Sequence, residues 1–113
     1  MNSHKMKLLP IYFDSLRKGV KYIEIRCNDE KRQKICVGDQ IAFCNIETCE
    51  EIQTEVIALE VYSSFEELIR QHPIESFGFT NTSINEVLKS IRTIYSEEQE
   101  HRYGVLALIL KKI

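Results

Sequence analysis

The hydrophobic pattern at the start of the chain predicts a strand, a helix and a second strand. Residues 6–8 alternate as in a short strand, and Pro10 then opens an apolar stripe with helical spacing. Gly19 follows this stripe, where a glycine typically ends a helix in a left-handed conformation. Residues 21–27 alternate strictly, so their polar side chains would share one face of a strand and their apolar side chains the other.

The rest of the chain predicts two more strands, two helices and a closing strand. Strands are expected over residues 40–44 and 52–62, the second of them rich in Ile, Val and Thr. Capping boxes at Ser64 and Ser83 each precede a helical apolar stripe. The apolar run 103–110 has the length of a strand that is buried on both faces.

The resulting order is β-α-β-β-β-α-α-β, without internal repeats or a linker. Successive strands favour antiparallel pairing, and about five strands in so short a chain leave exposed edges unless the sheet curls. We therefore expect an α+β fold, a small mixed β-barrel of about five strands flanked by about three helices. The 113 residues are expected to form a single domain over residues 1–113.

Charge is distributed unevenly, although the formal net charge is only −2. Residues 1–40 hold nine basic and five acidic side chains, whereas residues 41–113 hold six and twelve. Nucleic-acid-binding domains usually carry a net positive charge, so the total charge argues against a nucleic-acid-binding domain. The basic excess of residues 1–40 nevertheless favours a local anion-binding site. The excess is small, which suits one or a few nucleotides better than a long polyanion.

Other features exclude several classes of protein. No apolar run approaches the roughly 20 residues of a transmembrane helix, and the first residues lack the apolar core of a signal peptide, so a cytoplasmic location is expected. The histidines are scattered and predict structural or surface roles. The cysteines form no C-x-x-C pair, which predicts small buried side chains and no metal site. They are Cys27, Cys36, Cys44 and Cys49.

The segment 19–26 holds the strongest candidates for a binding site. Lys21 offers a point charge and Arg26 a planar fork of donors, and together they suit a phosphate or a carboxylate. Glu24 between them is an acceptor for the amino group of a base, and Gly19 leaves room for a ligand. Strict alternation puts Lys21 on the opposite face, so a shared site needs a bend at the strand entry. The alternative is that Glu24 and Arg26 belong to a solvated face.

Neighbouring residues add weaker candidates. Tyr12 and Tyr22 suit stacking on a base, and packing explains them equally well. The charged segment 96–102 is expected to be a solvated loop. The basic loop (residues 28–34) adds further candidate ligand-binding residues, which are Asn28, Lys31 and Arg32.

With these residues, the sequence resembles the ASCH domain family (activating signal cointegrator homology), whose members have a PUA-like β-barrel. The resemblance covers most of the chain and rests on the family's G-x-K-x-x-x-x-R pattern, met by Gly19, Lys21 and Arg26. The order of this pattern relative to Val37-Gly38-Asp39 and the closing Tyr103-Gly104-Val105 makes it more specific. The other matching segments are Met6-Lys7-Leu8, Tyr12-Phe13, Ser64-Phe65-Glu66-Glu67-Leu68 and Ile94-Tyr95-Ser96.

The resemblance implies a cleft beside the barrel that is lined by Lys21 and Arg26. It also places Ser96 and Tyr103 beside this cleft. From it we expect a binding module for RNA or a nucleotide-like small molecule, such as a modified nucleoside. No cofactor, metal or membrane partner is expected, and the oligomeric state stays open.

Two alternatives stand beside this expectation. A small bacterial branch of the family hydrolyses cytidine acetylated on its exocyclic amine, with a Lys–Thr–Glu constellation. Lys21 matches its lysine, but Glu24 stands in place of the threonine, and no acid stands near Thr80, where the glutamate falls; Glu75 and Thr80 are candidate neighbours. If the protein is an amidohydrolase, Lys21 and Glu24 are the candidate catalytic residues, with Glu24 as general base. The second alternative is a protein-interaction adaptor that uses the acidic second part of the chain.

Overall fold

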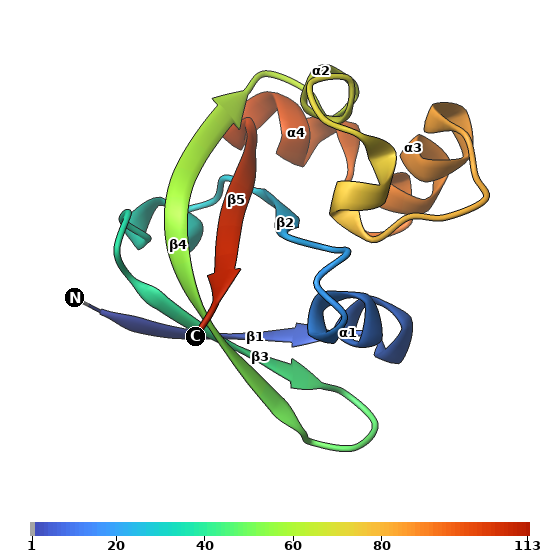
Figure 1. Ribbon diagram of the computed structural model, residues 1–113. Helices are drawn as coiled ribbons and strands as arrows, with labels where there is room; N and C mark the ends of the chain where they lie inside the picture. Colours follow the sequence, from blue (N-terminus) through green and yellow to red (C-terminus); the bar gives the residue numbers. More distant parts are fainter. Residues whose placement is uncertain (1) are drawn as a thin grey trace.

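A strongly curled five-stranded sheet forms the centre of the computed structural model, which describes residues 2–113 (Figure 1). The sheet order is β1-β3-β4-β5-β2, in which β1 and β3 run parallel and every other neighbouring pair is antiparallel. The edge strands β1 and β2 are not paired with each other, so the sheet is a half-barrel with an open seam. The strands are β1 (Ser3–Leu8), β2 (Ile23–Cys27), β3 (Gln40–Asn45), β4 (Glu51–Tyr62) and β5 (Val105–Lys112).

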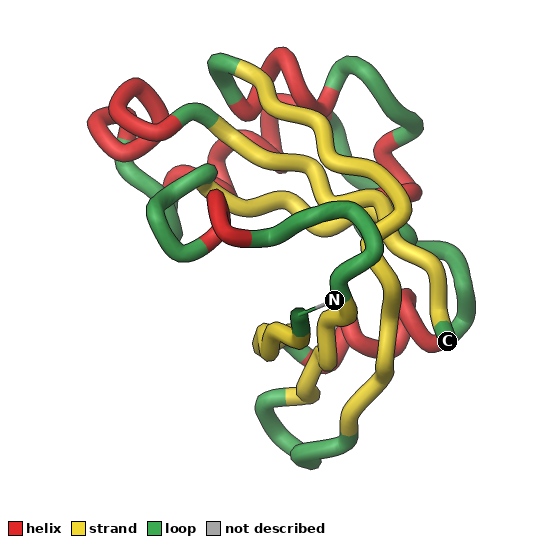
Figure 2. Tube along the Cα trace, turned by 90° about the vertical axis from the view of Figure 1, so that its left-hand side faces the viewer, coloured by secondary structure: helices red, strands yellow, loops and turns green. Residues whose placement is uncertain are grey.

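Helices lie at both ends of the curled strands, as Figure 2 shows. α1 lies beside the edge strand β1, whereas α2, α3 and α4 gather where β5 begins (Figure 1). Within the described part of the chain, no helix is long and apolar enough to cross a membrane. The helices are α1 (Pro10–Arg17), α2 (Phe65–Ile69), α3 (Ile84–Arg92) and α4 (Glu97–Tyr103), with short 3-10 turns η1 (Arg32–Lys34) and η2 (Ile74–Phe77).

The predicted helix signals are confirmed where they were strongest. Pro10 is the first residue of α1, and Gly19 follows the helix with φ +81°, donating its N–H to the carbonyl of Leu16 at 3.1 Å. The hydroxyls of Ser64 and Ser83 accept hydrogen bonds from backbone N–H groups in the first turns of α2 and α3. However, the reciprocal glutamate bonds of the predicted capping boxes are not formed, because Glu67 and Glu86 accept from Ser63 and Thr82 instead. Local capping chemistry therefore fixes where these helices begin and end.

β5 is buried on both faces, as its apolar run predicted, and it separates two hydrophobic cores. Leu106, Leu108 and Leu110 point into the core that fills the half-barrel. Val105 and Ala107 point the other way, into a second core beneath α2, α3 and η2. The fold is thus the expected α+β half-barrel of five strands, and the neighbouring edge strand β2 contributes Ile23 to the second core.

Residues 96–102 do not form the solvated loop that their charge predicted. Ser96 accepts from the N–H of Gln99, and the side chain of Gln99 accepts from the N–H of Ser96 at 2.9 Å, which completes a capping box for α4. The helix continues to Tyr103, so the closing strand begins at Val105 and not at residue 103. The segment is a short, mostly exposed helix whose N-cap is Ser96, with Gln99 as the reciprocal partner in the capping box.

The expectation that the cysteines are small buried side chains is wrong for most of them. Cys27 is buried, but Cys44 is half-buried and Cys36 is exposed. Cys49 is also exposed, and it occupies the hairpin turn between β3 and β4 with φ +64°. The apolar neighbours of Cys36 in the sequence do not bury it, because it lies in the loop before β3.

Candidate functional site

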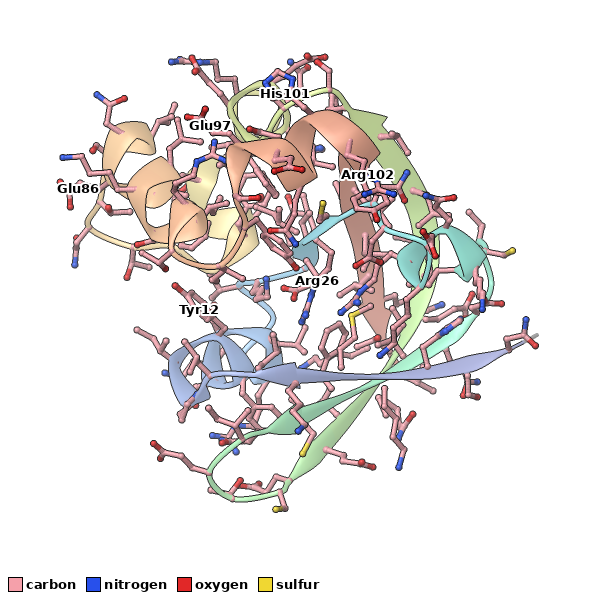
Figure 3. The ribbon with its side chains drawn as sticks, turned by 180° about the vertical axis from the view of Figure 1, so that it is seen from behind. Tyr12, Arg26, Glu86, Glu97, His101 and Arg102 are labelled. Atoms are coloured by element: carbon pink, nitrogen blue, oxygen red, sulfur yellow. The ribbon has the colours of Figure 1, made fainter. Side chains whose placement is uncertain are left out.

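A cavity of about 200 Å³, here called the first cavity, opens at the free edge of β2 and is lined by residues of both cores. β1 and α1 form one wall, with Leu8 and Tyr12, and the helical layer forms the other. Its polar lining is the charged triplet of Lys21, Glu24 and Arg26, together with Lys7 and Ser90. Figure 3 shows Tyr12 and Arg26 facing the same region between α1 and α3.

The chain bends before β2, and this bend brings Lys21 to Glu24. β2 begins only at Ile23, so Lys21 lies in the turn after α1 and escapes the alternation of the strand. The Lys21 ammonium donates to the backbone carbonyls of Ile23 at 2.7 Å and Phe77 at 2.9 Å. It also pairs with Glu24 Oε1 at 2.9 Å. All three donors of this buried ammonium are therefore engaged.

Arg26 continues the triplet toward the cavity mouth. Its Nε donates to Glu24 Oε2 at 2.7 Å, and its Nη2 forms an ion pair with the same oxygen at 2.6 Å. Nη2 also donates to the carbonyl of Lys7 at 3.1 Å, across the open seam between β2 and β1. Nη1 has no hydrogen-bond partner among residues 2–113. The triplet thus carries one net positive charge, and its free donor is on the most exposed member.

The cations of the triplet hold Glu24 in its ionised form. Burial by itself would raise the pKa of this carboxyl, but the charges and hydrogen bonds of Lys21 and Arg26 outweigh burial and lower the pKa below its ordinary value. Burial, and then the nearby charge of Glu24, raise the pKa of the Tyr12 phenol. At neutral pH the site therefore presents a carboxylate acceptor and a neutral phenol.

Aromatic side chains form the apolar wall of the first cavity. Tyr12 and Phe79 meet edge to face with 5.6 Å between ring centroids, and the Lys21 ammonium lies 6.0 Å from the Tyr12 centroid. Phe65 and Tyr95 are stacked at 5.5 Å on the helical side. Flat apolar surfaces beside hydrogen-bonding groups suit a planar heterocycle.

Gly78 allows η2 to pack closely against this wall. It has φ +96°, a conformation that L side chains rarely adopt. A Cβ atom there would lie 3.1 Å from Lys21 Cδ and 3.2 Å from Tyr12 Cδ1. Gly78 is therefore a positioning residue for Lys21 and Tyr12, one that the sequence alone does not single out.

The structure brings together only part of the predicted site. The charged triplet shares one cavity, and Glu24 is only 7% exposed, so the alternative of a solvated face is wrong for Glu24. Arg32 pairs with Asp29 in the basic loop instead. The other predicted ligand contacts do not line the first cavity, and their role in binding stays a prediction. They are Gly19, Asn28, Lys31, Arg32, Ser96 and Tyr103.

The sequence reasoning missed most of the aromatic wall, which comes from α2, η2 and the end of α3. Of the two candidate neighbours, Glu75 is exposed and lies outside the cavity, and Thr80 lines an adjoining cavity described below. Residues 2–113 contain no group of three or more His, Cys, Asp or Glu side chains arranged to hold a metal ion.

The half-barrel and its edge cavity define a PUA-like domain with a cationic pocket at one seam. The family model of the ASCH domain matches residues 6–113. The chain therefore belongs to the ASCH domain family, a PUA-like family that is often proposed to bind RNA.

Solved structures agree with this assignment. The chain is similar to hypothetical protein PH0355, with 37% identity over 98% of this chain and 99% of the other, and a TM-score of 0.88. It is also similar to protein PF0455 from Pyrococcus furiosus, with 32% identity over 98% and 97% and a TM-score of 0.79. ASCH from Zymomonas mobilis shares the fold at 11% identity, over 95% of this chain and 65% of the other, with a TM-score of 0.64. No curated protein matches the chain at the sequence level.

Proposed function

We propose that the protein binds a base with an exocyclic amine in the first cavity, either as a nucleotide of RNA or as a free modified nucleoside. The observation that carries this proposal is the charged triplet set against an aromatic wall, with free hydrogen-bonding capacity at Glu24 and Arg26. The frequent proposal of RNA binding for the ASCH family agrees with it.

The hydrogen-bonding capacity of the triplet matches the edge of a cytosine-like base. Glu24 Oε1 accepts one bond from Lys21, and a carboxylate oxygen offers about two acceptor positions. The second position suits an exocyclic amine, as when acidic side chains recognise the N4 amino group of cytosine. Arg26 Nη1 is free to donate to the neighbouring ring nitrogen or carbonyl. A small pyrimidine also suits a cavity of about 200 Å³.

The state of Glu24 favours binding over hydrolysis. A general base works best when its pKa lies near the working pH, whereas the pKa of Glu24 is held below its ordinary value. The amidohydrolase alternative also needs a nucleophile or an activated water, and the Lys21 ammonium makes no hydrogen bond to a hydroxyl group among the described residues. We therefore expect N4-acetylcytidine to bind without release of cytidine, even at high protein concentration.

The test is calorimetric titration with cytidine, N4-acetylcytidine and a single-stranded cytidine-rich RNA decamer. Arg26→Ala should weaken binding of each by about tenfold or more, because hydrogen bonds to charged groups contribute about 1.5–3 kcal/mol. Arg70→Ala is the matched control, since it removes the same charge from an exposed position of the chain that pairs only with Glu66. Equal affinities for the two variants, with both proteins folded, would contradict the proposal. Turnover of N4-acetylcytidine would instead support the amidohydrolase alternative.

The titration with the RNA decamer distinguishes a base that is part of RNA from a base in a free nucleoside. RNA binding should weaken steeply with added salt, because phosphate contacts release counterions, whereas nucleoside binding should change little. A nuclease-insensitive protein partner with no affinity for any of these probes would favour the adaptor alternative.

A further inference from the structure

A second cavity of about 400 Å³ adjoins the first and shares three lining residues with it, Tyr12, Phe79 and Ser90. The proposed function does not use this space. Ligand sites commonly measure roughly 300–1,000 Å³, so the first cavity alone is small for a whole ligand. The adjoining cavity brings the combined space within that range.

We propose that the second cavity is a ribose subsite for a nucleoside whose base lies in the first cavity, an inference that rests on the proposed function. The ligand class is then a ribonucleoside, with the glycosidic bond passing between Tyr12 and Ser90. Tyr12 and Phe79, which meet edge to face, line both cavities and would contact both parts of such a ligand.

The polar lining of the second cavity suits a neutral group with several hydroxyls. Besides the phenol of Tyr12, it combines three aliphatic hydroxyl groups with one carboxylate and one ammonium group, so donors and acceptors are mixed and the charges balance. A phosphate in the same place would meet the carboxylate of Glu86, which disfavours it. The polar residues are Thr80, Thr82, Glu86, Lys89 and Ser90.

Glu86 is the natural partner for the vicinal hydroxyls of a ribose. Its Oε2 accepts from Thr82 Oγ1 at 3.4 Å, and its backbone N–H is fixed by Ser83 Oγ at 3.2 Å in the first turn of α3. Its Oε1 accepts no hydrogen bond from the described residues. A carboxylate is an acceptor-only group, and bonds from hydroxyls to a charged oxygen are stronger than neutral ones.

The test compares four probes by calorimetry: cytosine, cytidine, 2′,3′-dideoxycytidine and cytidine 5′-monophosphate. Cytidine should bind at least tenfold more tightly than cytosine or dideoxycytidine. Glu86→Gln should reduce this preference severalfold, and Glu86→Gln combined with Thr80→Val should remove most of it. Glu97→Gln is the matched control, because Glu97 is an exposed glutamate in the first turn of α4 and lines neither cavity (Figure 3).

The outcomes separate the two proposals. If cytosine and cytidine bind equally, and Arg26→Ala weakens both, the ribose subsite is wrong and the base site stands. A monophosphate that binds at least tenfold more tightly than cytidine would assign the second cavity to phosphate and would also overturn the subsite. If no probe binds at millimolar concentration, both proposals are wrong.

Discussion

Two glutamates of residues 2–113 are buried, Glu24 on β2 and Glu100 on α4, and they differ in what surrounds the carboxylate. Glu24 holds two cationic side chains and lines the first cavity. Glu100 accepts from the backbone N–H of Phe65 at 2.7 Å and from Arg92 Nη2 at 2.9 Å, and it lines neither cavity.

The difference separates a structural charge from a binding charge. The bonds of Glu100 join α4 to the start of α2 and the end of α3, so its carboxylate holds the helical layer together. The bonds of Glu24 leave acceptor capacity on a carboxylate that lines the first cavity, and its arginine partner keeps a free donor. Burial of a charge does not by itself indicate a site, because buried structural pairs also require partners.

The largest expected effect is that of Lys21→Met, which removes the ammonium and leaves Glu24 with Arg26 alone. Breaking one partner from a buried ion pair typically costs about 3–5 kcal/mol, and we expect a loss of that order in the free energy of unfolding. Urea denaturation measures it, and cytidine titration of the folded variant should show weakened binding. A free energy of unfolding within about 0.5 kcal/mol of the parent protein would contradict the role given to Lys21.

Glu100→Ala should lower stability without a comparable loss of binding. It leaves the N–H of Phe65 and the guanidinium of Arg92 without their acceptor, which typically costs about 1–3 kcal/mol. Urea denaturation and cytidine titration measure the two quantities in the same preparation. If Glu100→Ala weakened cytidine binding as much as Lys21→Met, the division between the two glutamates would be wrong.

A pair of glycine variants sharpens the comparison on the cavity side. Gly78 and Gly38 both have strongly positive φ, +96° and +94°, so replacement by alanine strains either backbone by about 1–3 kcal/mol. Only at Gly78 would the new Cβ crowd Lys21 and Tyr12, because nothing lies within 4 Å at Gly38. Both variants should lose stability, Gly78→Ala more than Gly38→Ala because of this crowding, and only Gly78→Ala should weaken cytidine binding. Equal affinities would show that the packing of Gly78 does not position the site.

The smallest expected effect concerns Asp39, a buried carboxylate at neither cavity. Hydrogen bonds from His4 and from the N–H groups of Cys36 and Asn2 lower its pKa from 3.8 to about 2. A lowered folded-state pKa gives stability that is present above the unfolded value and is lost as the pH falls toward the folded value. Asp39→Asn should therefore flatten the acid dependence of unfolding between about pH 4 and pH 2, with no change in cytidine binding at pH 7. An unchanged acid dependence would contradict this role.

Local signals in the sequence predicted much of the fold. Pro10, Gly19 and the two serine caps marked helix ends, and the apolar run before the C-terminus predicted a strand buried on both faces. The helix α4 was missed because charge was weighted above the capping pair Ser96 and Gln99. The parallel pairing of β1 with β3 has no local signal, since the partner is chosen by packing between segments far apart in the chain.

In the site, too, features formed by neighbouring residues were predictable and features formed by distant segments were not. The charged triplet was predictable because its members lie within six residues of one another, and the bend at the strand entry that a shared site requires is present, since β2 begins only at Ile23. The aromatic wall was not predictable, because its rings reach the cavity from helical segments that are distant from the triplet in the sequence. The basic loop was a weaker candidate in the sequence, and none of its residues lines the first cavity.

A ¹H–¹⁵N NMR titration of the protein with cytidine tests the central claim most directly, since it reports on each segment in one experiment. We predict saturable shifts at the Arg26 Nε–H group, at the backbone amides of residues 23–26 and at those of residues 78–80, with residues 28–34 unchanged. Shifts confined to the basic loop, or no shifts at millimolar cytidine, would contradict the assignment of the binding site to the charged triplet.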